Sequence, residues 1–476
     1  MERTCIICGV AANSREHVFP AALGGRRTNK GIYCDTHNGD YSELANIIAN
    51  QMRFFNSQIG VVGDHQKSTG EVKPVLLIDP ATKAEMWLTN TSTAYAEPRI
   101  VSATSHSKGG STIEIAANSP EQLEAYVAEL QKKGLNVRIE SKGTPGIYYP
   151  GTLEGRLDLG GTYTGLRAIA YIAQTFLAHA FPELARLPEL APIKEYTLNN
   201  SGKDFAWWLN PYDEEHDPQR KRFSHRVIVG HNADDNVIYA RISLFGAFHY
   251  GVNLGVAATV SSRSVVFVID PLAKHPPQDL QKTEYDIAVG YSPKPKNLTK
   301  YLGDSIKNGE AKASVDALMR SIQDFQRENL AKKWLQELEE TKPTDQETAN
   351  LFFKRLVSVE SGWVLRLIRH SRRNFSQAMS NFENGDIAKI LRYYSENDEL
   401  DPYSSDGLSD YGRMLLEISS AALVRKLIDD FFNGELDQDR MEMLLNGGQG
   451  LHTVCRVVLD EATLKVLGYA ISDEVY

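Results

Sequence analysis

Four metal-binding residues near the start of the chain constrain its fold more than any other feature. Cys5 and Cys8 form a Cys-x-x-Cys pair, and Cys34 and His37 form a Cys-x-x-His pair. Two-residue spacing allows both side chains of a pair to face one ion, and four such ligands complete a closed tetrahedral site. Thiolates and imidazoles are the ligands that structural Zn²⁺ prefers. We therefore predict a bound zinc that folds this segment, which is too short to have a large core of its own.

A group of polar residues lies within and directly after this segment. They are Glu16, His17, Asn29 and Asn38. Pro20 and a Leu23-Gly24-Gly25 turn follow the Glu-His pair. This pattern resembles the HNH, or ββα-metal, endonucleases, in the subgroup in which a zinc knuckle braces a two-stranded ribbon and a helix. The resemblance covers roughly residues 1–60 and does not extend beyond them.

The resemblance implies a role for each polar residue. His17 would be the general base that activates water, and Asn29 would fix the ribbon and orient His17. Glu16 and Asn38 would hold one catalytic Mg²⁺ or Mn²⁺. These roles agree with the chemistry, because phosphodiester hydrolysis needs a base for water and a cation for the charge that develops on phosphate. Carboxylate and amide oxygens suit Mg²⁺ or Mn²⁺, and histidine titrates near neutral pH.

The sequence departs from the family pattern at two positions. Asn38 replaces the usual closing histidine, and His37 replaces the usual fourth knuckle cysteine. Two assignments of His37 therefore remain open: it ligates zinc, or it ligates the catalytic ion and leaves zinc with three protein ligands. The two-residue spacing from Cys34 favours the zinc assignment.

The charge balance restricts how the chain meets nucleic acid. Its formal net charge is −9, so any contact with DNA must be a local basic patch on an acidic body. Arg26, Arg27 and Lys30 form one basic cluster inside the resembling segment, where we expect nucleic-acid contacts.

A second basic run lies far downstream, between residues 366 and 373. Two interpretations remain open for it. It is a solvated helix end, or Arg369, Arg372 and Arg373 contact a DNA backbone or a partner protein.

The cysteine count indicates the compartment. Three of the four cysteines have metal-ligand spacing, which is typical of a reducing environment rather than a disulfide scaffold. We find neither a signal peptide nor an apolar run long enough to span a bilayer, and we expect a cytoplasmic protein with no membrane partner.

The 476 residues predict two or three domains of overall α+β class. We place a zinc-braced HNH module at 1–62, a mixed α+β domain at 72–270 and an all-helical domain at 300–476. Signals inside them include a capped helix at 119–134, a buried helix at 162–181 and strands between 223 and 270. Residues 271–300 are rich in proline and lysine and indicate a linker or a sheet edge.

The sequence therefore favours a divalent-metal-dependent HNH endonuclease that acts on DNA. By analogy with family members of this plan, the implied setting is bacterial defence against phage or foreign DNA, with a partner defence subunit or an activating ligand. Two alternatives remain: a zinc-binding interaction module without catalysis, and an RNA-cleaving nuclease. The sequence does not show what residues 72–476 sense, and we hypothesise that they restrain or direct the HNH module, with 300–476 as a sensor or partner-binding region.

Overall fold

The computed structural model of the chain describes most of the sequence. The described residues are 3–63, 72–79, 83–89, 93–105, 111–117, 119–137, 154–155, 163–202, 204–209, 221–258, 261–273, 280–359, 403–404, 407–408 and 423–445. They form a mixed α+β structure, as the sequence predicts, and divide into two compact units. Unit 1 comprises Met1–Val75 and Arg156–Gln323, and unit 2 comprises Leu76–Gly155 and Asp324–Tyr476.

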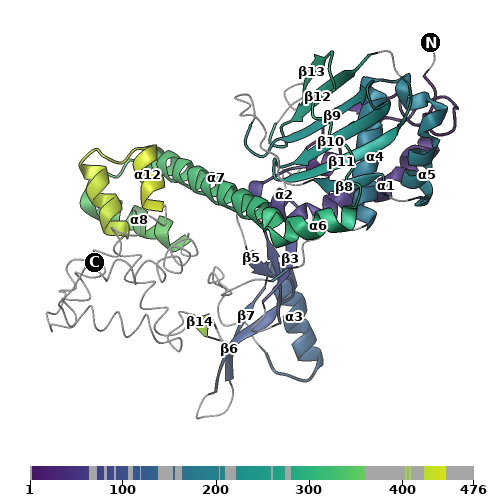
Figure 1. Cartoon of the computed structure of the whole chain (residues 1–476). Coiled ribbons are helices and arrows are strands. Elements are labelled where there is room, and N and C mark those ends of the chain that lie inside the picture. The colour runs from purple at the N-terminus through teal and green to yellow at the C-terminus, as the bar shows by residue number, and fades with distance from the viewer. Residues whose placement is uncertain are drawn as a thin grey trace. The chain divides into compact units, whose positions relative to one another are not determined.

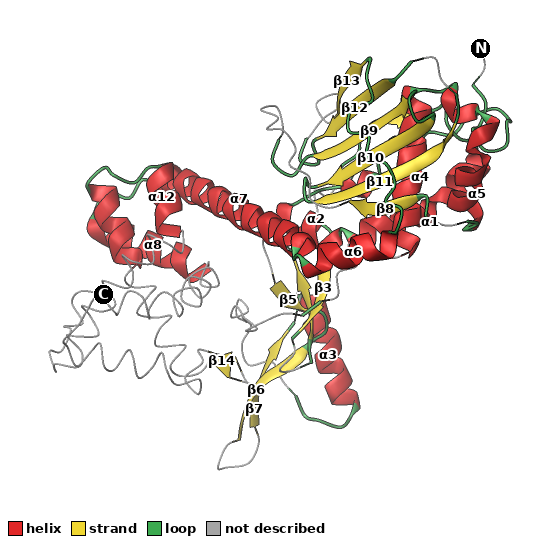
Figure 2. Cartoon of the chain, viewed as in Figure 1, coloured by secondary structure: helices red, strands yellow, loops and turns green. Residues whose placement is uncertain are grey.

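A six-stranded antiparallel sheet is the largest element of unit 1 (Figures 1 and 2). Its strands, in chain order, are β8 (Ala206–Leu209), β9 (His225–Asn232), β10 (Val237–Leu244), β11 (Phe248–Val256), β12 (Arg263–Ile269) and β13 (Leu280–Tyr285). Across the sheet the order is β13-β12-β9-β10-β11-β8. Strands β9 to β12 match the strands predicted between 223 and 270. The polar β13 is an edge strand, so part of the 271–300 segment belongs to the sheet edge.

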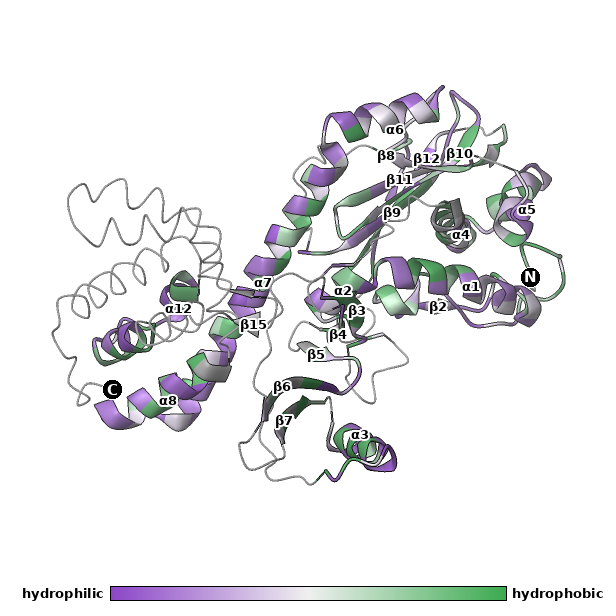
Figure 3. Cartoon of the chain, turned by 90° about the horizontal axis from the view of Figure 1, so that it is seen from below, coloured by the Kyte–Doolittle hydropathy of each residue, from purple (hydrophilic) through white to green (hydrophobic). Residues whose placement is uncertain are grey.

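Helix α4 (Tyr163–Ala180) is the buried helix that the sequence predicts. Every residue from 168 to 178 is buried. One side of α4 contacts the sheet, where the rings of Phe176 and Phe267 lie 4.9 Å apart. The other side contacts α1 (Asp35–Gln51), and Figure 3 shows α4 between the sheet and α1. A helix covered on two sides must be apolar nearly all round, and this explains its composition.

The N-terminal segment folds as a short ribbon followed by helices. Its elements are β1 (Glu16–His17), the 3₁₀ turn η1 (Ala21–Leu23), β2 (Thr28–Asn29), α1 and α2 (Arg53–Ile59). Strands β1 and β2 pair antiparallel. The order of ribbon and helix therefore agrees with the sequence prediction.

The glycine turn after η1 is required by close packing. Gly24 has φ +89°, and a Cβ there would lie 2.5 Å from Pro271 Cα. A Cβ on Gly25 would overlap the carbonyl group of Phe19. Only glycine adopts the left-handed conformation at no cost, so Gly24 allows the turn to pack against Pro271 after β12. Gly25 allows the turn to close onto the Phe19 backbone.

The N-terminal segment shares one hydrophobic core with the sheet. The Phe19 ring lies 4.9 Å from the ring of His225, and Phe55 lies 5.1 Å from Phe248. Phe55 is 0% exposed. Burial of such side chains stabilises the fold by about 2 kcal/mol each, so the ribbon and α2 depend on sheet residues for their stability.

The first part of unit 2 contains a small sheet, a hairpin and one helix. These are β3 (Val75–Ile78), β4 (Glu85–Leu88) and β5 (Thr93–Tyr95), then β6 (Arg99–Ser105) and β7 (Ser111–Ala116), then α3 (Pro120–Lys132). The predicted helix cap is confirmed, because Ser119 Oγ accepts a hydrogen bond from the Gln122 backbone at 3.2 Å. Gly134, with φ +86°, follows the helix at the end of the predicted 119–134 range.

Beyond β13 the described chain is mainly helical, as predicted. The helices are α6 (Leu298–Lys307), α7 (Glu310–Thr341), α8 (Gln346–Val359), residues 423–432 and α12 (Gln438–Leu445). In unit 2, Trp334, Phe353, Leu427 and Met441 belong to one buried cluster. Residues 360–402 and 446–476 of the predicted helical domain, which include the basic run at 366–373, lie outside the described residues. In the described part of the chain, none of the helices combines the length and apolar character needed to cross a lipid bilayer.

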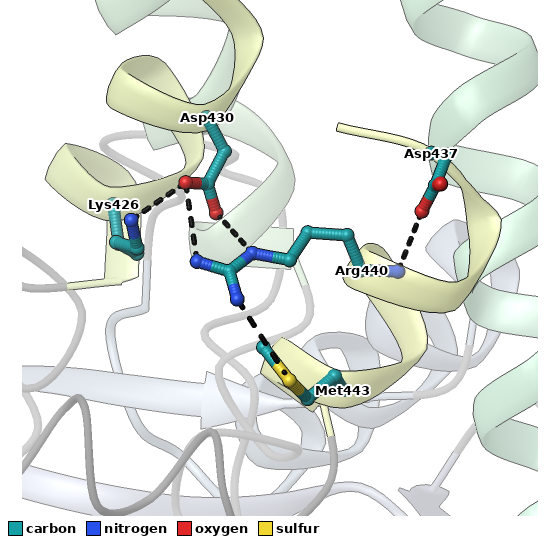
Figure 4. A network of polar contacts seen from close by, with 5 residues as sticks. All are labelled: Lys426, Asp430, Asp437, Arg440 and Met443. Carbon is teal, nitrogen blue, oxygen red and sulfur yellow. Dashed lines mark hydrogen bonds and ion pairs between the residues drawn. The ribbon is translucent and has the colours of Figure 1, made fainter. Parts of the chain in front are cut away.

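A buried ion network joins the helix at 423–432 to α12 (Figure 4). The Asp430 side chain is 0% exposed and accepts from Lys426 Nζ at 2.6 Å and Arg440 Nε at 2.8 Å. Burial alone would raise the pKa of Asp430, but hydrogen bonds from Arg440 and Lys426 outweigh it and lower the pKa below its ordinary value. The carboxylate therefore stays charged and links the two helices.

We predict that Asp430→Asn destabilises this helical region by about 3 kcal/mol, because it removes the charge that compensates two partly buried cations. Hydrogen–deuterium exchange in peptides covering 423–445 should become about 100-fold faster. Asp439→Asn is the matched control, because Asp439 is an exposed acid on α12. Equal exchange in the two variants would contradict the prediction.

Candidate functional site

The four predicted zinc ligands come together at one point. Cys5 and Cys8 lie in a turn closed by the Gly9 backbone, which donates to Cys5 O at 2.9 Å. Cys34 is the N-cap of α1, and His37 lies in the first turn of that helix. Their ligand atoms all lie within 4.8 Å of one another, so the group could hold a metal ion.

The spacing of these atoms fits tetrahedral zinc. A Zn–S bond of about 2.3 Å places two sulfurs of a tetrahedron about 3.8 Å apart, and a sulfur and a nitrogen about 3.5 Å apart. Cys8 Sγ and Cys34 Sγ are 3.8 Å apart. His37 Nδ1 lies 3.6 Å from Cys5 Sγ and 3.2 Å from Cys34 Sγ. His37 therefore belongs to the cysteine cluster, which favours the first of its two assignments.

Arg186, which follows α4, links the residues beside this cluster to the end of α4. Its guanidinium donates to the backbone carbonyls of Thr4, Gly31 and Pro182. The Ile6 backbone also donates to Ile32 O at 3.0 Å, which joins the Cys-x-x-Cys turn to the residues before Cys34. The cluster is thus tied to the ribbon and to α4 at the same time.

We predict about one tightly bound zinc per chain. Elemental analysis of protein purified without added metal should find it, and Cys8→Ser should lose it, because a thiolate is removed from the tetrahedron. Ser14→Ala changes a buried residue between the two ligand pairs and should keep the zinc. A wild-type protein that is folded and free of metal would exclude the zinc site.

The ribbon sets two of the polar residues side by side. Glu16 on β1 is the direct cross-strand partner of Asn29 on β2, and His17 is the partner of Thr28. Side chains of directly opposed residues lie on the same face of a strand pair, and neighbours along a strand lie on opposite faces. Glu16 and Asn29 therefore share one face of the ribbon, and His17 lies on the other.

Helix α4 provides a hydrogen bond to each residue on the first face. Tyr171 donates to Glu16 Oε1 at 2.5 Å, and His179 Nδ1 lies 2.9 Å from Asn29 Nδ2. Asn29 Oδ1 also accepts from the Gly31 backbone at 2.8 Å. The ribbon is therefore fixed to α4 at both positions, and the Asn29 amide is used to hold the ribbon.

Glu16 is a desolvated carboxyl group. It is 9% exposed, and burial raises its pKa to about 7, although the Tyr171 hydrogen bond acts in the opposite direction. The Tyr171 ring stacks on Tyr41 of α1 at 5.0 Å. Because Tyr171 is held by this packing, it has little freedom to turn away from Glu16.

His17 and Asn38 complete the set of predicted polar residues. His17 is half-buried. Asn38 lies in the first turn of α1, one residue after the zinc ligand His37, and its backbone donates to Cys34 O at 2.9 Å. Asn38 Oδ1 is shielded from solvent and has no hydrogen-bond partner among the described residues. A buried acceptor without a donor is unfavourable unless something else binds it.

The predicted nucleic-acid contacts fall in different places. Lys30 is exposed and Arg27 is half-buried. Arg26 donates from Nε to Ala273 O at 2.6 Å, so at least part of its guanidinium holds the ribbon to the segment after β12. Arg369, Arg372 and Arg373 lie outside the described residues.

Two residues of this site are missing from the sequence prediction. Tyr171 and His179 lie on a helix that reads as an ordinary buried helix, and the sequence contains no signal that pairs them with the ribbon. Tyr171 and Glu16 are 155 residues apart.

Comparison with known proteins gives no relative. No protein-family profile matches the chain, and neither a curated protein nor a solved structure is significantly similar to it.

Proposed function

We propose that this protein is a divalent-metal-dependent endonuclease of the HNH type that hydrolyses DNA phosphodiester bonds. The observation that supports this most directly is the arrangement of the N-terminal segment. A Cys₃His cluster joins a two-stranded ribbon to a helix, with Glu16 and His17 on the first strand and Asn38 in the first helical turn. By family analogy, its setting would be defence against phage or foreign DNA.

The residues present fit a catalytic cation. Asn38 supplies a shielded amide oxygen that has no donor among the described residues, and Glu16 supplies a desolvated carboxyl group. Both are hard oxygen ligands of the kind that Mg²⁺ or Mn²⁺ takes. When bound, such an ion stabilises the negative charge that develops on a phosphate.

The protein side chains perform the remaining steps. His17 accepts the proton of the attacking water as the general base. Asn29 keeps β2 in register opposite β1, which holds His17 in place. Neither function needs the zinc cluster to take part chemically, because that cluster has four protein ligands and no open position.

Tyr171 is a positioning residue in this proposal. Its hydroxyl group binds one oxygen of Glu16 and so sets the orientation of the carboxylate toward the cation. Hydrogen bonds of this kind commonly change metal affinity by about 10- to 100-fold. The hydrogen bond from Tyr171 to Glu16 couples the ribbon to α4, which lies outside the segment of roughly residues 1–60 that resembles HNH endonucleases.

We predict that His17→Ala lowers DNA cleavage by a factor of about 10² to 10⁴, with zinc content and circular dichroism unchanged. The assay incubates purified protein with supercoiled plasmid, linear DNA and RNA in the presence of Mg²⁺, Mn²⁺ or chelator. Thr28→Ala, which changes the cross-strand partner of His17, is the control for damage to the ribbon. Cleavage at the wild-type rate by His17→Ala would remove the proposed base, and cleavage of RNA alone would change the substrate.

We further predict that Tyr171→Phe weakens Mn²⁺ binding by about 10-fold or more while zinc stays bound, because the ring still packs and only the hydrogen bond is lost. Titration calorimetry with Mn²⁺ measures this directly. Tyr250→Phe is a matched control, because Tyr250 is a fully buried tyrosine of the sheet. If Glu16→Ala abolished Mn²⁺ binding and Tyr171→Phe left it unchanged, Tyr171 would have no positioning role.

A further inference from the structure

Several segments of unit 1 meet around His179 at the C-terminal end of α4. Asn29 of the ribbon contacts its Nδ1 atom, and the His179 ring lies 5.8 Å from Phe267 of β12. Lys282 on the edge strand β13 is the direct cross-strand partner of Phe267. Lys282 therefore projects from the same face of the sheet as Phe267, the face on which His179 lies.

Two arginines approach the same place from the N-terminal segment. Arg27 lies two residues before Asn29, and its carbonyl accepts from the Val18 backbone at 2.9 Å, so the ribbon continues through it. Alternation along a strand places Arg27 and Asn29 on the same side. The Arg3 side chain packs over Gly31 and leaves no room there for a Cβ. Arg3, Arg27, His179 and Lys282 thus come from four separate segments; we call them the flank cluster.

The flank cluster has positive electrostatic potential. Burial lowers the pKa of His179 to about 4, and the positive charges of Arg27, Lys282 and Arg3 contribute to this shift. His179 is therefore neutral at pH 7. Because its Nδ1 accepts from the Asn29 amide, the tautomer has its proton on Nε2, which is a hydrogen-bond donor.

One carboxylate partly offsets this charge. Glu284 on β13 pairs with Lys282 at 2.6 Å and with Arg263 at 2.7 Å. Both pairs are more than 40% exposed, and exposed pairs contribute only about 0–1 kcal/mol. Lys282 can therefore exchange Glu284 for a phosphate at little cost. The three cations of the cluster stand out on a chain whose net charge is −9.

We propose that the flank cluster binds the sugar-phosphate backbone of duplex DNA beside the scissile position. This inference rests on the proposed function, because it takes nucleic acid as the substrate. Asn29 directly opposes Glu16, and such Cα atoms lie about 5 Å apart, whereas one DNA strand rises about 3.4 Å per nucleotide. The phosphates bound here therefore lie within a few nucleotides of a phosphate bound through Glu16, which shares this face of the ribbon with Asn29.

The cluster also explains how an acidic protein meets a polyanion. Arg3 and Lys282 lie outside the predicted basic cluster, while Arg26 uses its Nε in a contact with a backbone carbonyl. The edge strand of the sheet therefore contributes to substrate binding. DNA would be contacted by the ribbon and by the sheet edge together, which restricts its orientation on the ribbon.

The test measures the salt dependence of DNA binding in the full-length chain. A fluorescent 30-base-pair duplex is titrated with His17→Ala protein, and anisotropy is recorded across about 50–200 mM salt. Each phosphate contact adds about 0.9 to the slope of log K against log salt. Lys282→Ala and Arg3→Ala should each reduce the slope by about 0.9, and the double variant by about 1.8. Lys282→Glu should lower affinity more than Lys282→Ala.

Lys307→Ala is the matched control, because Lys307 is an exposed lysine at the end of α6 and its loss changes the net charge equally. It should leave the slope unchanged. The inference is overturned if Lys282→Ala and Arg3→Ala behave like Lys307→Ala. In that case His17-dependent cleavage of plasmid would still support the nuclease proposal, so the two failures are distinguishable. Binding of single-stranded RNA in place of the duplex would also overturn it.

Discussion

The candidate site depends on a buried polar seam between α4 and the N-terminal segment. Gln174 of α4 is 0% exposed and donates to the hydroxyl groups of Tyr33 and Tyr41, each at 3.3 Å. Thr175 pairs with Tyr33 at 3.0 Å. In a low-dielectric interior such bonds are directional and costly to leave unmade. They therefore fix one register of the ribbon and α1 on α4, where apolar packing alone would tolerate several.

The seam complements the Cys₃His cluster, whose two ligand pairs lie on either side of Glu16, His17 and Asn29 in the sequence. A zinc ion bound to the Cys₃His cluster would close the chain locally between the Cys-x-x-Cys turn and the start of α1 and supply order that a small segment lacks. The seam and the aromatic contacts of Phe19 and Phe55 then join that ordered segment to the sheet. The metal cluster would thus order the segment locally, and the packing contacts hold it on the sheet.

How far the sequence predicts this structure depends on the distance over which each signal acts. The Cys₃His cluster, the glycine turn, the Ser119 cap and the buried helix follow from spacing or local chemistry, and each is found. The β9–β12 strands follow from runs of β-branched and aromatic residues. The apolar β8 is buried but has only four residues, too few to show a strand period. The polar β13 has no apolar pattern, because this edge strand is exposed at all but its first residue.

The site residues that cannot be predicted from the sequence are those whose role depends on tertiary contacts. Tyr171 and His179 are unremarkable members of an apolar helix until the fold brings them to Glu16 and Asn29. Arg26 illustrates the reverse case. Its place in a basic cluster suggests a contact with phosphate, yet its Nε is bonded to a carbonyl 247 residues further along the chain. A charge pattern shows which charged residues a segment contains. Only the fold shows which of them are already bound to other protein groups.

The separation between Glu16 and Tyr171 has a consequence for synthesis of the chain. Tyr171 leaves the ribosome 155 residues after Glu16. Pro271, against which Gly24 of the glycine turn packs, leaves it later still. At about 5–20 residues per second, the ribosome leaves the ribbon without its Tyr171 partner for roughly 10 to 30 seconds. A nascent chain, or one released early, therefore carries Glu16, His17, Asn29 and Asn38 without the contacts that hold Glu16 in place. Because the residues that hold Glu16 and the glycine turn lie far downstream in the sequence, the site is completed only after the rest of unit 1 has been synthesised.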